Sequence, residues 1–463
     1  MTISYQTHAI SVNPANGETL NAYPYDSEQQ IDRVIERTHQ AGKQWSQLSV
    51  TQRSAKLRDL AVALREHAEE LAQMIRAEMG KPILQARGEV NKSANLCEWY
   101  AEHGPAMLTT LPTQVENNQA VMEFRPLGTV LAVMPWNFPL WQVLRGAVPI
   151  MLAGNSYLLK HAPNVMGSAQ LIERIFIAAG VSQGEFSIIN ATPEGVSQAI
   201  KHPLIAAVTF TGSVRAGKAI GEQAGAALKK SVLELGGSDP FIVLAGADLD
   251  QAVKAAVAGR YQNTGQVCAA SKRFIVEQPI AAEFTAKFVA AVNQLKTGAP
   301  DEEGNYIGPM ARFDLRDELH GQVEATLAEG ATLLAGGHKL AGEGNYYAPT
   351  VLADVQPQMT AFRQELFGPV AAITVANDVD HAIELANDSD FGLAATIYSG
   401  DEELAQQLAA RLECGGVFIN GYSASDPRVA FGGVKKSGYG RELSQFGLYE
   451  FCNIQTVWKN RQG

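Results

Sequence analysis

The chain has 463 residues, of which 46% are hydrophobic, and it contains 42 glycines and 20 prolines. This length is too great for one ordinary core, so we expect two large domains, and the composition excludes a disordered or fibrous chain. The formal charge of −11, from 37 basic and 48 acidic residues, argues against a nucleic-acid or anionic-membrane partner.

Helices predominate in the predicted structure of the first hundred residues. Apolar residues recur at helical spacing over 27–45 and 51–78, and Gly80-Lys81-Pro82 ends the second of these helices. Beyond Phe124 the pattern changes to short apolar or β-branched runs that alternate with amphipathic helices. These runs are 128–134, 156–160, 186–190 and 206–211. The alternation is typical of a parallel, doubly wound α/β sheet.

A second alternating series begins near Pro240. Its apolar runs are FIVL after Pro240, then 273–277, 371–375, 394–399 and 416–420. The two series meet at 233–240, so we expect a two-domain α/β enzyme with its site at that seam, because ligands favour strand carboxyl ends and domain interfaces. The final segment, 448–458, predicts a terminal strand that pairs either with a partner subunit or within its own subunit.

The N-terminal segment has neither a basic patch nor an apolar core, so a secretory signal is not expected. The longest apolar stretch, 146–153, is too short to cross a bilayer. The nine histidines do not cluster, and no C-x-x-C pair occurs among the four cysteines, which are Cys97, Cys268, Cys414 and Cys452. We therefore predict no metal site, no disulfide framework and a reduced, cytoplasmic setting.

A glycine-containing loop begins at Gly212 and Ser213 and continues through Gly217 to Ala219. It is almost a Walker A loop, but Ala219 stands where that motif needs Ser or Thr for Mg²⁺, so a P-loop ATPase is a poor alternative. The loop could instead cradle a pyrophosphate, because glycines permit close backbone approach and helix-start N–H groups attract anions. A plain strand-to-helix turn is an equal alternative, since the G-x-G-x-x-G fingerprint is missing.

Three residues carry candidate chemistry. Cys268 lies in a loop of small residues, although a lone cysteine is by default a buried filler. Glu234 lies in an apolar strand that runs into two glycines, and a carboxylate there indicates a function rather than a structural salt bridge. Asn137 follows a strand end between two prolines, where an Asx turn is the alternative.

Together these segments resemble the aldehyde dehydrogenase superfamily along nearly the whole chain. The resemblance rests on seven motifs in matching order and spacing, which makes chance negligible. They are PWNFP at 135–139, Lys160, FTGS at 210–213, LELGG at 233–237, GQVC at 265–268, ELFGPV at 365–370 and FGGVKKSGYGRE at 431–442.

The resemblance implies a cysteine mechanism. Cys268 would attack the aldehyde carbon, and the oxyanion would be held by the Cys268 backbone N–H and the Asn137 amide. After hydride transfer, Glu234 would activate the water that hydrolyses the thioester. Glu442 would take part in proton relay, with a surface salt bridge as its alternative. A relative that passes its thioester to CoA typically lacks the carboxylate found at 234, so hydrolysis is favoured here.

The resemblance also implies NAD or NADP as the cofactor. Lys160 would reach the adenosine ribose, Glu365 the nicotinamide ribose, and Phe367 would pack near the nicotinamide. The remaining implied cofactor residues are Pro135, Trp136, Gly212, Ser213, Gly217, Leu235 and Gly236. Where NAD-preferring relatives usually have Glu three residues after the lysine, this chain has Pro163. No carboxylate there would repel a 2′-phosphate, so both cofactors are plausible.

Arg145 interrupts an apolar helix that should line the substrate tunnel, and it resembles the arginine with which succinate-semialdehyde dehydrogenases bind the distal carboxylate. An internal salt bridge is the alternative. The second arginine of those relatives is replaced by Gln262, and the replacement candidates are Ser423, Ser425 and Arg428, in a segment that could equally be a solvated turn. Succinate semialdehyde is the expected substrate, with glutarate semialdehyde or neutral aliphatic aldehydes as alternatives. Because Ala269 and Ala270 follow Cys268, no local disulfide switch is expected.

The resemblance implies an α/β fold with a Rossmann-like cofactor domain, an α/β catalytic domain and a small oligomerisation β-element. The expected boundaries are 1–107 with 127–236 for the dinucleotide-binding domain and 237–441 for the catalytic domain. The oligomerisation or bridging elements would be 108–126 and 442–463. A homodimer or homotetramer is therefore expected.

Overall fold

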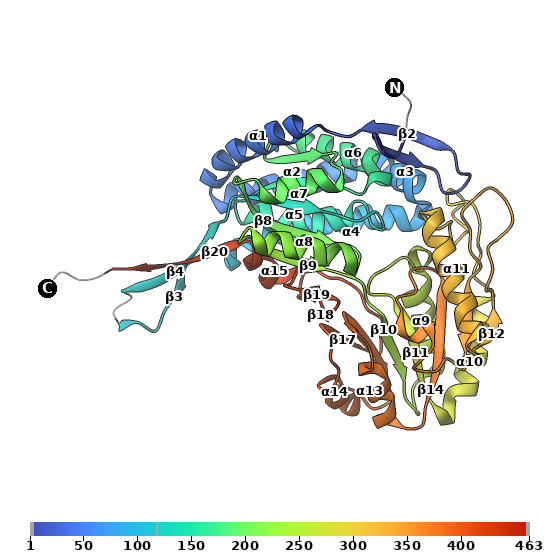
Figure 1. The fold of residues 1–463 in the computed structure, drawn as a ribbon. Coiled ribbons are helices and arrows are strands. Elements are labelled where there is room, and N and C mark those ends of the chain that lie inside the picture. The colour runs from blue at the N-terminus through green and yellow to red at the C-terminus, as the bar shows by residue number, and fades with distance from the viewer. Residues whose placement is uncertain (1–3, 117–118, 460–463) are drawn as a thin grey trace.

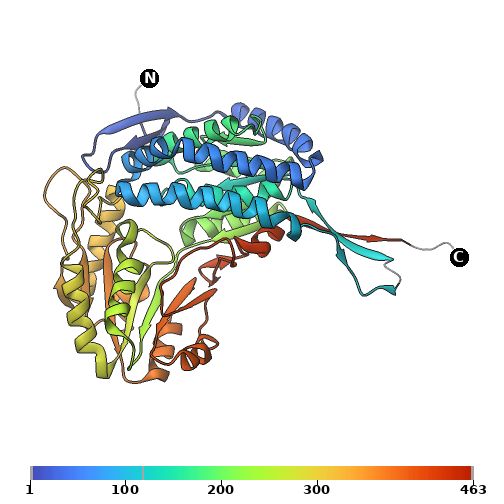
Figure 2. The same ribbon diagram turned by 180° about the vertical axis from the view of Figure 1, so that it is seen from behind.

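A computed structural model describes residues 4–116 and 119–459. Two lobes, each built around a mainly parallel sheet, lie one above the other, and a narrow sheet projects from one side (Figure 1). The same arrangement is visible from behind (Figure 2), where the long helices of the N-terminal lobe cover its sheet. The α/β class predicted from the sequence is confirmed.

The N-terminal lobe contains a six-stranded sheet in the order β19-β9-β8-β5-β6-β7, in which only β19 is antiparallel to its neighbour. Its strands are β5 (Thr129–Val133), β6 (Ser156–Lys160), β7 (Phe186–Ile189), β8 (Ile205–Thr211), β9 (Lys230–Glu234) and β19 (Gly438–Tyr439). The four predicted apolar runs match β5, β6, β7 and β8, because a parallel sheet covered on both faces buries nearly every side chain. From β5 the chain adds β6 and β7 on one side of the sheet, and then β8 and β9 on the other side. The gap between β5 and β8 is therefore a topological switch point, where ligands bind at the carboxyl ends of strands.

Helices pack on both faces of this sheet, and serine capping boxes begin the first two of them at Ser27 and Ser49. The helices are α1 (Glu28–Gln47), α2 (Val50–Glu66), α3 (Ala68–Met79), α4 (Ile83–Met107), α5 (Trp141–Leu152), α6 (Met166–Ala178), α7 (Pro193–Lys201) and α8 (Val214–Ala226). The single helix predicted over 51–78 is wrong, because the chain breaks at His67 (φ −98°, ψ 16°). After this break, α2 and α3 each bury their own set of apolar residues. Gly80, at φ +73°, ends α3 as predicted.

The C-terminal lobe contains a seven-stranded sheet in the order β12-β13-β14-β11-β10-β16-β17, parallel except for the β12–β13 pair. Its strands are β10 (Asp239–Val243), β11 (Ser271–Glu277), β12 (Thr332–Ala335), β13 (Thr350–Ala353), β14 (Val370–Ala376), β16 (Ala394–Tyr398) and β17 (Gly416–Ile419). Its helices are α9 (Leu249–Tyr261), η3 (Gln262–Gly265), α10 (Gln278–Val292), α11 (Phe313–Ala328), α12 (Thr360–Arg363), α13 (Val379–Asn387) and α14 (Glu402–Ala409). Smaller elements are β1 (His8–Val12), β2 (Thr19–Pro24), η2 (Pro163–Val165), β15 (Phe391–Gly392) and β18 (Val434–Lys435).

The projecting sheet consists of β3 (Leu111–Pro112), β4 (Ala120–Pro126) and β20 (Cys452–Trp458). β20 pairs antiparallel with β4 of its own chain along its full length. The strand predicted over 448–458 is therefore wrong at its start, because α15 (Ser444–Glu450) holds Leu448 in the apolar core. The predicted oligomerisation role of 108–126 and 442–463 stays a prediction, and 117–118 and 460–463 lie outside the described residues.

The predicted domain boundaries also stay a prediction. Residues 1–3, which belong to the predicted dinucleotide-binding domain, lie outside the described residues. The chain passes from one sheet to the other over 235–238, between β9 and β10, and β19 returns to pair with β9. Across the described residues, no helix is both long and apolar enough to span a membrane.

Candidate active site

The loop that carries Cys268 has an unusual backbone. Asn263 and Thr264 both have left-handed φ angles, 54° and 55°, although neither is glycine. Gly265 follows at φ +72°, and a Cβ there would lie 2.3 Å from the Gly368 carbonyl oxygen. Such backbone persists only where surrounding contacts enforce it, and it is typical of functional sites. The loop is thus pressed against the segment that carries Glu365 and Phe367.

Asn137 is held against this loop from the other lobe. Its side-chain Nδ2 donates to the Gln266 carbonyl at 3.1 Å, and its own carbonyl accepts from Asn263 Nδ2 at 2.8 Å. An amide nitrogen has two hydrogens, so one remains for another acceptor. Cys268, two residues after Gln266, therefore lies in the loop to which this amide is anchored.

His161 fixes the segment that carries Asn137. Its Nδ1 accepts from the Ala162 backbone N–H at 2.9 Å, which leaves Nε2 to donate to the Pro139 carbonyl at 2.9 Å. Burial lowers the pKa of His161 to about 4, so the ring stays neutral and keeps this tautomer. The sequence alone gave no reason to select His161, beyond its place after Lys160.

Cys268 is a protonated thiol at neutral pH in this environment. Burial raises its pKa to about 11, with smaller opposing effects from the positive charges of Arg145 and Lys272. Lys272 was not anticipated as a site residue. Its Nζ donates to the Cys268 carbonyl at 2.5 Å and forms an ion pair with Glu365 Oε1 at 3.2 Å. A lysine buried in an apolar strand just after the cysteine was the available signal.

Glu234 ends β9 and is only 2% exposed. Among the described residues, neither of its carboxylate oxygens has a hydrogen-bond partner. Its pKa is raised well above the ordinary range, first by burial and second by the negative charge of Glu442, with Arg145 opposing both. A buried carboxyl with free oxygens and a raised pKa is a suitable general base.

Arg145 and Glu442 form a buried ion pair, with side chains that are 2% and 4% exposed. The guanidinium carbon of Arg145 also lies 4.7 Å from the centre of the Phe431 ring. The internal salt bridge considered as the alternative for Arg145 is therefore present. Glu442 faces this arginine and is not a surface group. A carboxylate substrate that reached Arg145 would meet a cation already neutralised by Glu442.

The residues predicted to hold the cofactor surround the switch point. Ser213 caps α8 by accepting from the Ala216 N–H at 3.3 Å, directly after Gly212. Gly217 lies inside α8, where a Cβ would come within 2.4 Å of Leu235 Cδ2. Its role in the structure is thus close helix–strand packing.

Three further features fit a dinucleotide. A Cβ on Gly236 would lie 2.2 Å from Glu365 Oε2, so only glycine lets the Glu365 carboxylate pack against this backbone. Lys160 ends β6 without an ion-pair partner in the described part of the chain, and burial lowers its pKa to about 8. Trp136, next to Pro135, packs edge-on against Phe367 with ring centres 5.8 Å apart. The N-terminus of α8 next to Gly212 and the ammonium of Lys160, which has no ion-pair partner among the described residues, suit an anionic nucleotide.

The predicted substrate residues fall into different environments. Gln262 is exposed, and Arg428 is exposed and pairs with Asp426 at 2.8 Å, which favours the solvated-turn alternative for Arg428. Ser423 Oγ is buried without a partner among the described residues. Ser425 Oγ bonds to Lys92 Nζ at 2.9 Å. Lys92, on α4, was not selected from the sequence.

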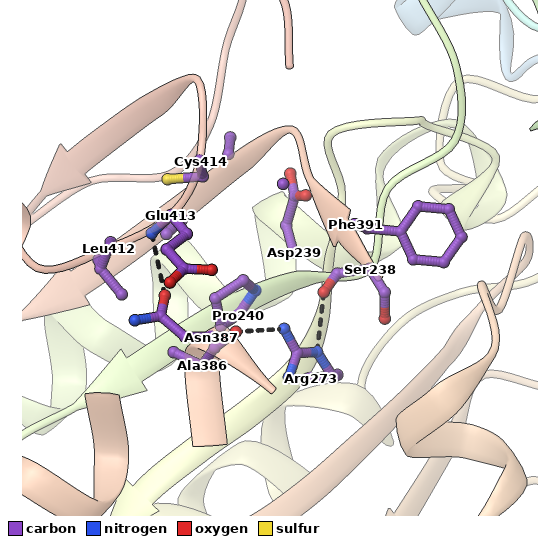
Figure 3. A pocket seen from close by; sticks show the side chains of 13 residues that line it. Ser238, Asp239, Pro240, Arg273, Ala386, Asn387, Phe391, Leu412, Glu413 and Cys414 are labelled. Atoms are coloured by element: carbon purple, nitrogen blue, oxygen red, sulfur yellow. Dashed lines mark hydrogen bonds between the residues drawn. The ribbon is translucent and has the colours of Figure 1, made fainter. Parts of the chain in front are cut away.

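A pocket that Cys268 does not line lies in the C-terminal lobe beside β10 (Figure 3). Its cavity volume of about 10 Å³ has room for about one water molecule. Arg273 crosses it and donates to the Ser238 and Ala386 carbonyls, each at 2.8 Å. These bonds connect β11 to its neighbours, so the pocket is a structural feature of the sheet.

The chain is similar to known proteins along nearly its whole length. Residues 3–457 match the model of the aldehyde dehydrogenase family. The chain is 69% identical to the succinate semialdehyde dehydrogenase [NAD(P)+] Sad of Escherichia coli, with all of both chains covered. It is 44% identical to a probable succinate-semialdehyde dehydrogenase [NADP(+)] of Synechocystis, over 97% of this chain and 99% of that one.

Solved structures show the same fold. A succinic semialdehyde dehydrogenase from Streptococcus pyogenes in complex with NADP+ superimposes with a TM-score of 0.95 at 35% identity, over 98% of this chain and 100% of that one. An aldehyde dehydrogenase from Bacillus cereus in complex with NAD+ gives a TM-score of 0.94 at 30% identity, over 98% and 93% of the two chains.

Proposed function

Since the chain belongs to the aldehyde dehydrogenase family, we propose that it oxidises succinate semialdehyde to succinate with NAD+ or NADP+ as oxidant. The observation that carries the chemistry is the anchoring of the Asn137 amide on the Cys268 loop, near a buried carboxyl, Glu234, whose oxygens have no hydrogen-bond partner among the described residues. The substrate is proposed from the likeness to the Escherichia coli and Synechocystis enzymes.

The proposed reaction has two stages that share one sulfur atom. The Cys268 thiolate attacks the aldehyde carbon, and the new oxyanion accepts hydrogen bonds from the Cys268 backbone N–H and the free hydrogen of the Asn137 amide. When bound, the oxidised nicotinamide supplies the acceptor for the hydride lost from this carbon. The acyl group then remains on Cys268 as a thioester. Glu234 takes a proton from the attacking water, and the acid and the thiolate are released.

The acid–base properties of the site support these roles. Because burial raises the pKa of the Cys268 thiol to about 11, the thiolate needs a base, and the raised pKa of Glu234 makes it a strong one. Arg145 and Glu442 hold one positive and one negative charge beside that base. We assign to Glu442 the role of keeping the pKa of Glu234 high through its negative charge, and of passing on the proton that Glu234 accepts.

The cofactor residues are those around the switch point. Lys160 and Ser213 would hold the ribose and pyrophosphate side, and Glu365 the nicotinamide ribose. No carboxylate follows Lys160 in the Lys160-His161-Ala162-Pro163 segment, so the 2′-phosphate of NADP meets no like charge there. Use of both cofactors is consistent with the names of the related enzymes.

An activity panel tests this proposal. The wild-type enzyme should show a much higher kcat/KM for succinate semialdehyde than for butyraldehyde, which has the same chain length but no carboxylate. Glutarate semialdehyde belongs in the panel because Gln262 replaces the second arginine of the relatives. Equal values for the charged and neutral aldehydes would contradict the proposed substrate, and no reduction of either cofactor by any aldehyde would contradict the reaction.

We also propose that the sheet of β3, β4 and β20 joins copies of the chain into a dimer or tetramer. Ile454 and Trp458 are 53% and 54% exposed on β20, and the sheet projects from the body (Figure 1). Exposed apolar side chains on a projecting sheet are typical of an interface. The molar mass in solution, measured by light scattering, tests this proposal, and a monomer would contradict it.

A further inference from the structure

Lys92 lies where α4 meets α5 and the loop over 421–430, and α5 is the helix predicted to line the substrate tunnel. It is on the same face of α4 as Gln85, seven residues earlier, whose Oε1 accepts from the Asn263 N–H at 2.7 Å in the catalytic loop. The Nζ of Lys92 bonds to Ser425 Oγ at 2.9 Å and lies 4.1 Å from the centre of the Trp141 ring on α5. The ammonium is thus partly buried beside the helix that carries Arg145.

The carboxylates around Lys92 form ion pairs with other cations. Glu89, on the same helix, forms a buried ion pair with Lys81, and its other oxygen accepts from the Leu140 and Trp141 N–H groups at 2.9 Å. Asp426, next to Ser425, is paired with Arg428. Within 4–116 and 119–459, Lys92 itself has no carboxylate in ion-pair contact.

Arg145, by contrast, is neutralised by Glu442. A substrate carboxylate that entered between α4, α5 and the 421–430 loop would therefore find its uncompensated positive charge on Lys92. Hydrogen bonds between an ammonium and a carboxylate are strong where water is limited, and Ser425 could share the same oxygen atoms.

We propose that Lys92 is a specificity-determining residue that binds the distal carboxylate of the semialdehyde and supplies the positive charge that Arg145, paired with Glu442, does not. This inference rests on the proposed function, since it requires a substrate with a second, anionic end. It assigns the recognition of that end to α4, an element in which the sequence singled out no site residue.

The pH dependence gives one readout. Burial lowers the pKa of Lys92 to about 8, with further lowering by Arg145 and Lys81 and opposing effects of Glu89 and Asp426. Lysine is charged below its pKa, so the attraction is present at pH 7 and is lost as the pH rises through about 8. The ratio of kcat/KM for succinate semialdehyde to that for butyraldehyde should therefore fall above this pH. Ionisation of the catalytic thiol and base cancels in that ratio.

The deciding experiment compares Lys92→Met with wild type on both aldehydes. Loss of one charge-assisted contact should lower kcat/KM for the semialdehyde about ten- to hundredfold, mainly through KM, and leave butyraldehyde within about twofold. Its substrate ratio should no longer vary with pH. Succinate, titrated by calorimetry, should bind more weakly to the variant, and Lys92→Arg should keep most of the preference.

Lys229→Met is the matched control, because Lys229 is also partly buried and hydrogen-bonded, but to the Ile200 and His202 carbonyls. It should leave the substrate ratio unchanged. A parallel loss on both aldehydes in Lys92→Met, or an unchanged ratio, would overturn the inference. If wild type itself fails to prefer the semialdehyde, the proposed substrate is wrong. If wild type prefers it and Lys92→Met does too, only the role of Lys92 is wrong.

Discussion

Replacing Arg145 by methionine removes the cation of a buried ion pair and leaves two buried carboxyl groups, Glu442 and Glu234, without it. Breaking one side of such a pair costs about 3–5 kcal/mol of folding free energy, because the remaining charge is left uncompensated. With an unfolding entropy of about 2 cal/mol/K per residue, the 463 residues give about 1 kcal/mol/K, so the melting temperature should fall by about 3–5 °C.

The loss should depend on pH. Burial already raises the pKa of Glu442, and Arg145 opposes that effect. Without Arg145 the pKa of Glu442 rises further, so the folded state keeps a proton on Glu442 that the unfolded state has released. The free energy of unfolding of the variant therefore falls as the pH increases. Arg145→Met should therefore lie closer to wild type at pH 6 than at pH 9.

Differential scanning fluorimetry across this pH range measures both effects. Arg363→Met is the matched control, because Arg363 also pairs with a carboxylate, Asp388, but in solvent, with side chains 45% and 46% exposed. An exposed pair contributes about 0–1 kcal/mol, so this variant should melt within about 1 °C of wild type. Equal melting temperatures for Arg145→Met and wild type at pH 9 would refute the electrostatic account of the site.

Two further outcomes follow from the geometry around the thiol. Asn137→Ala removes one oxyanion donor and should lower kcat about 10²- to 10³-fold, with cofactor binding retained. Stopped-flow absorbance of the reduced cofactor measures this loss. A normal kcat would show that Asn137 has no part in the mechanism. Burial raises the pKa of Cys268 to about 11, and only the thiolate reacts with iodoacetamide. The rate of alkylation of Cys268 should therefore increase about tenfold per pH unit between pH 7 and 9. A rate that levels off below pH 8 would show that the thiol is already ionised there.

The strands were predictable because their signal is local. Buried parallel strands such as 156–160 are continuous apolar runs, and their bounds in the sequence and in the structure agree closely. The break at His67 and the helix over 444–450 were not predictable. Both depend on which neighbouring surface an apolar stripe packs against, and that information lies elsewhere in the chain.

Some of the candidate site could likewise be predicted from local sequence, and the rest could not. Cys268, Glu234 and Asn137 could be selected from motifs and from their unusual local context. The pairing of Arg145 with Glu442 and the contact of Lys92 with Ser425 could not, because they join residues about three hundred positions apart in sequence. Gln262 was selected by analogy with relatives; the structure leaves its side chain exposed, and its contact with the substrate stays a prediction.

The most direct test of the central claim is to stop the reaction after its first stage. Glu234→Gln keeps the size of the side chain but removes the base, so a burst of reduced cofactor equal to one per active site should precede a slow steady state. Intact-protein and peptide mass spectrometry at the end of the burst should find one succinyl group, on Cys268. A variant that turns over at the wild-type rate, or an acyl group found on any residue other than Cys268, would contradict the account.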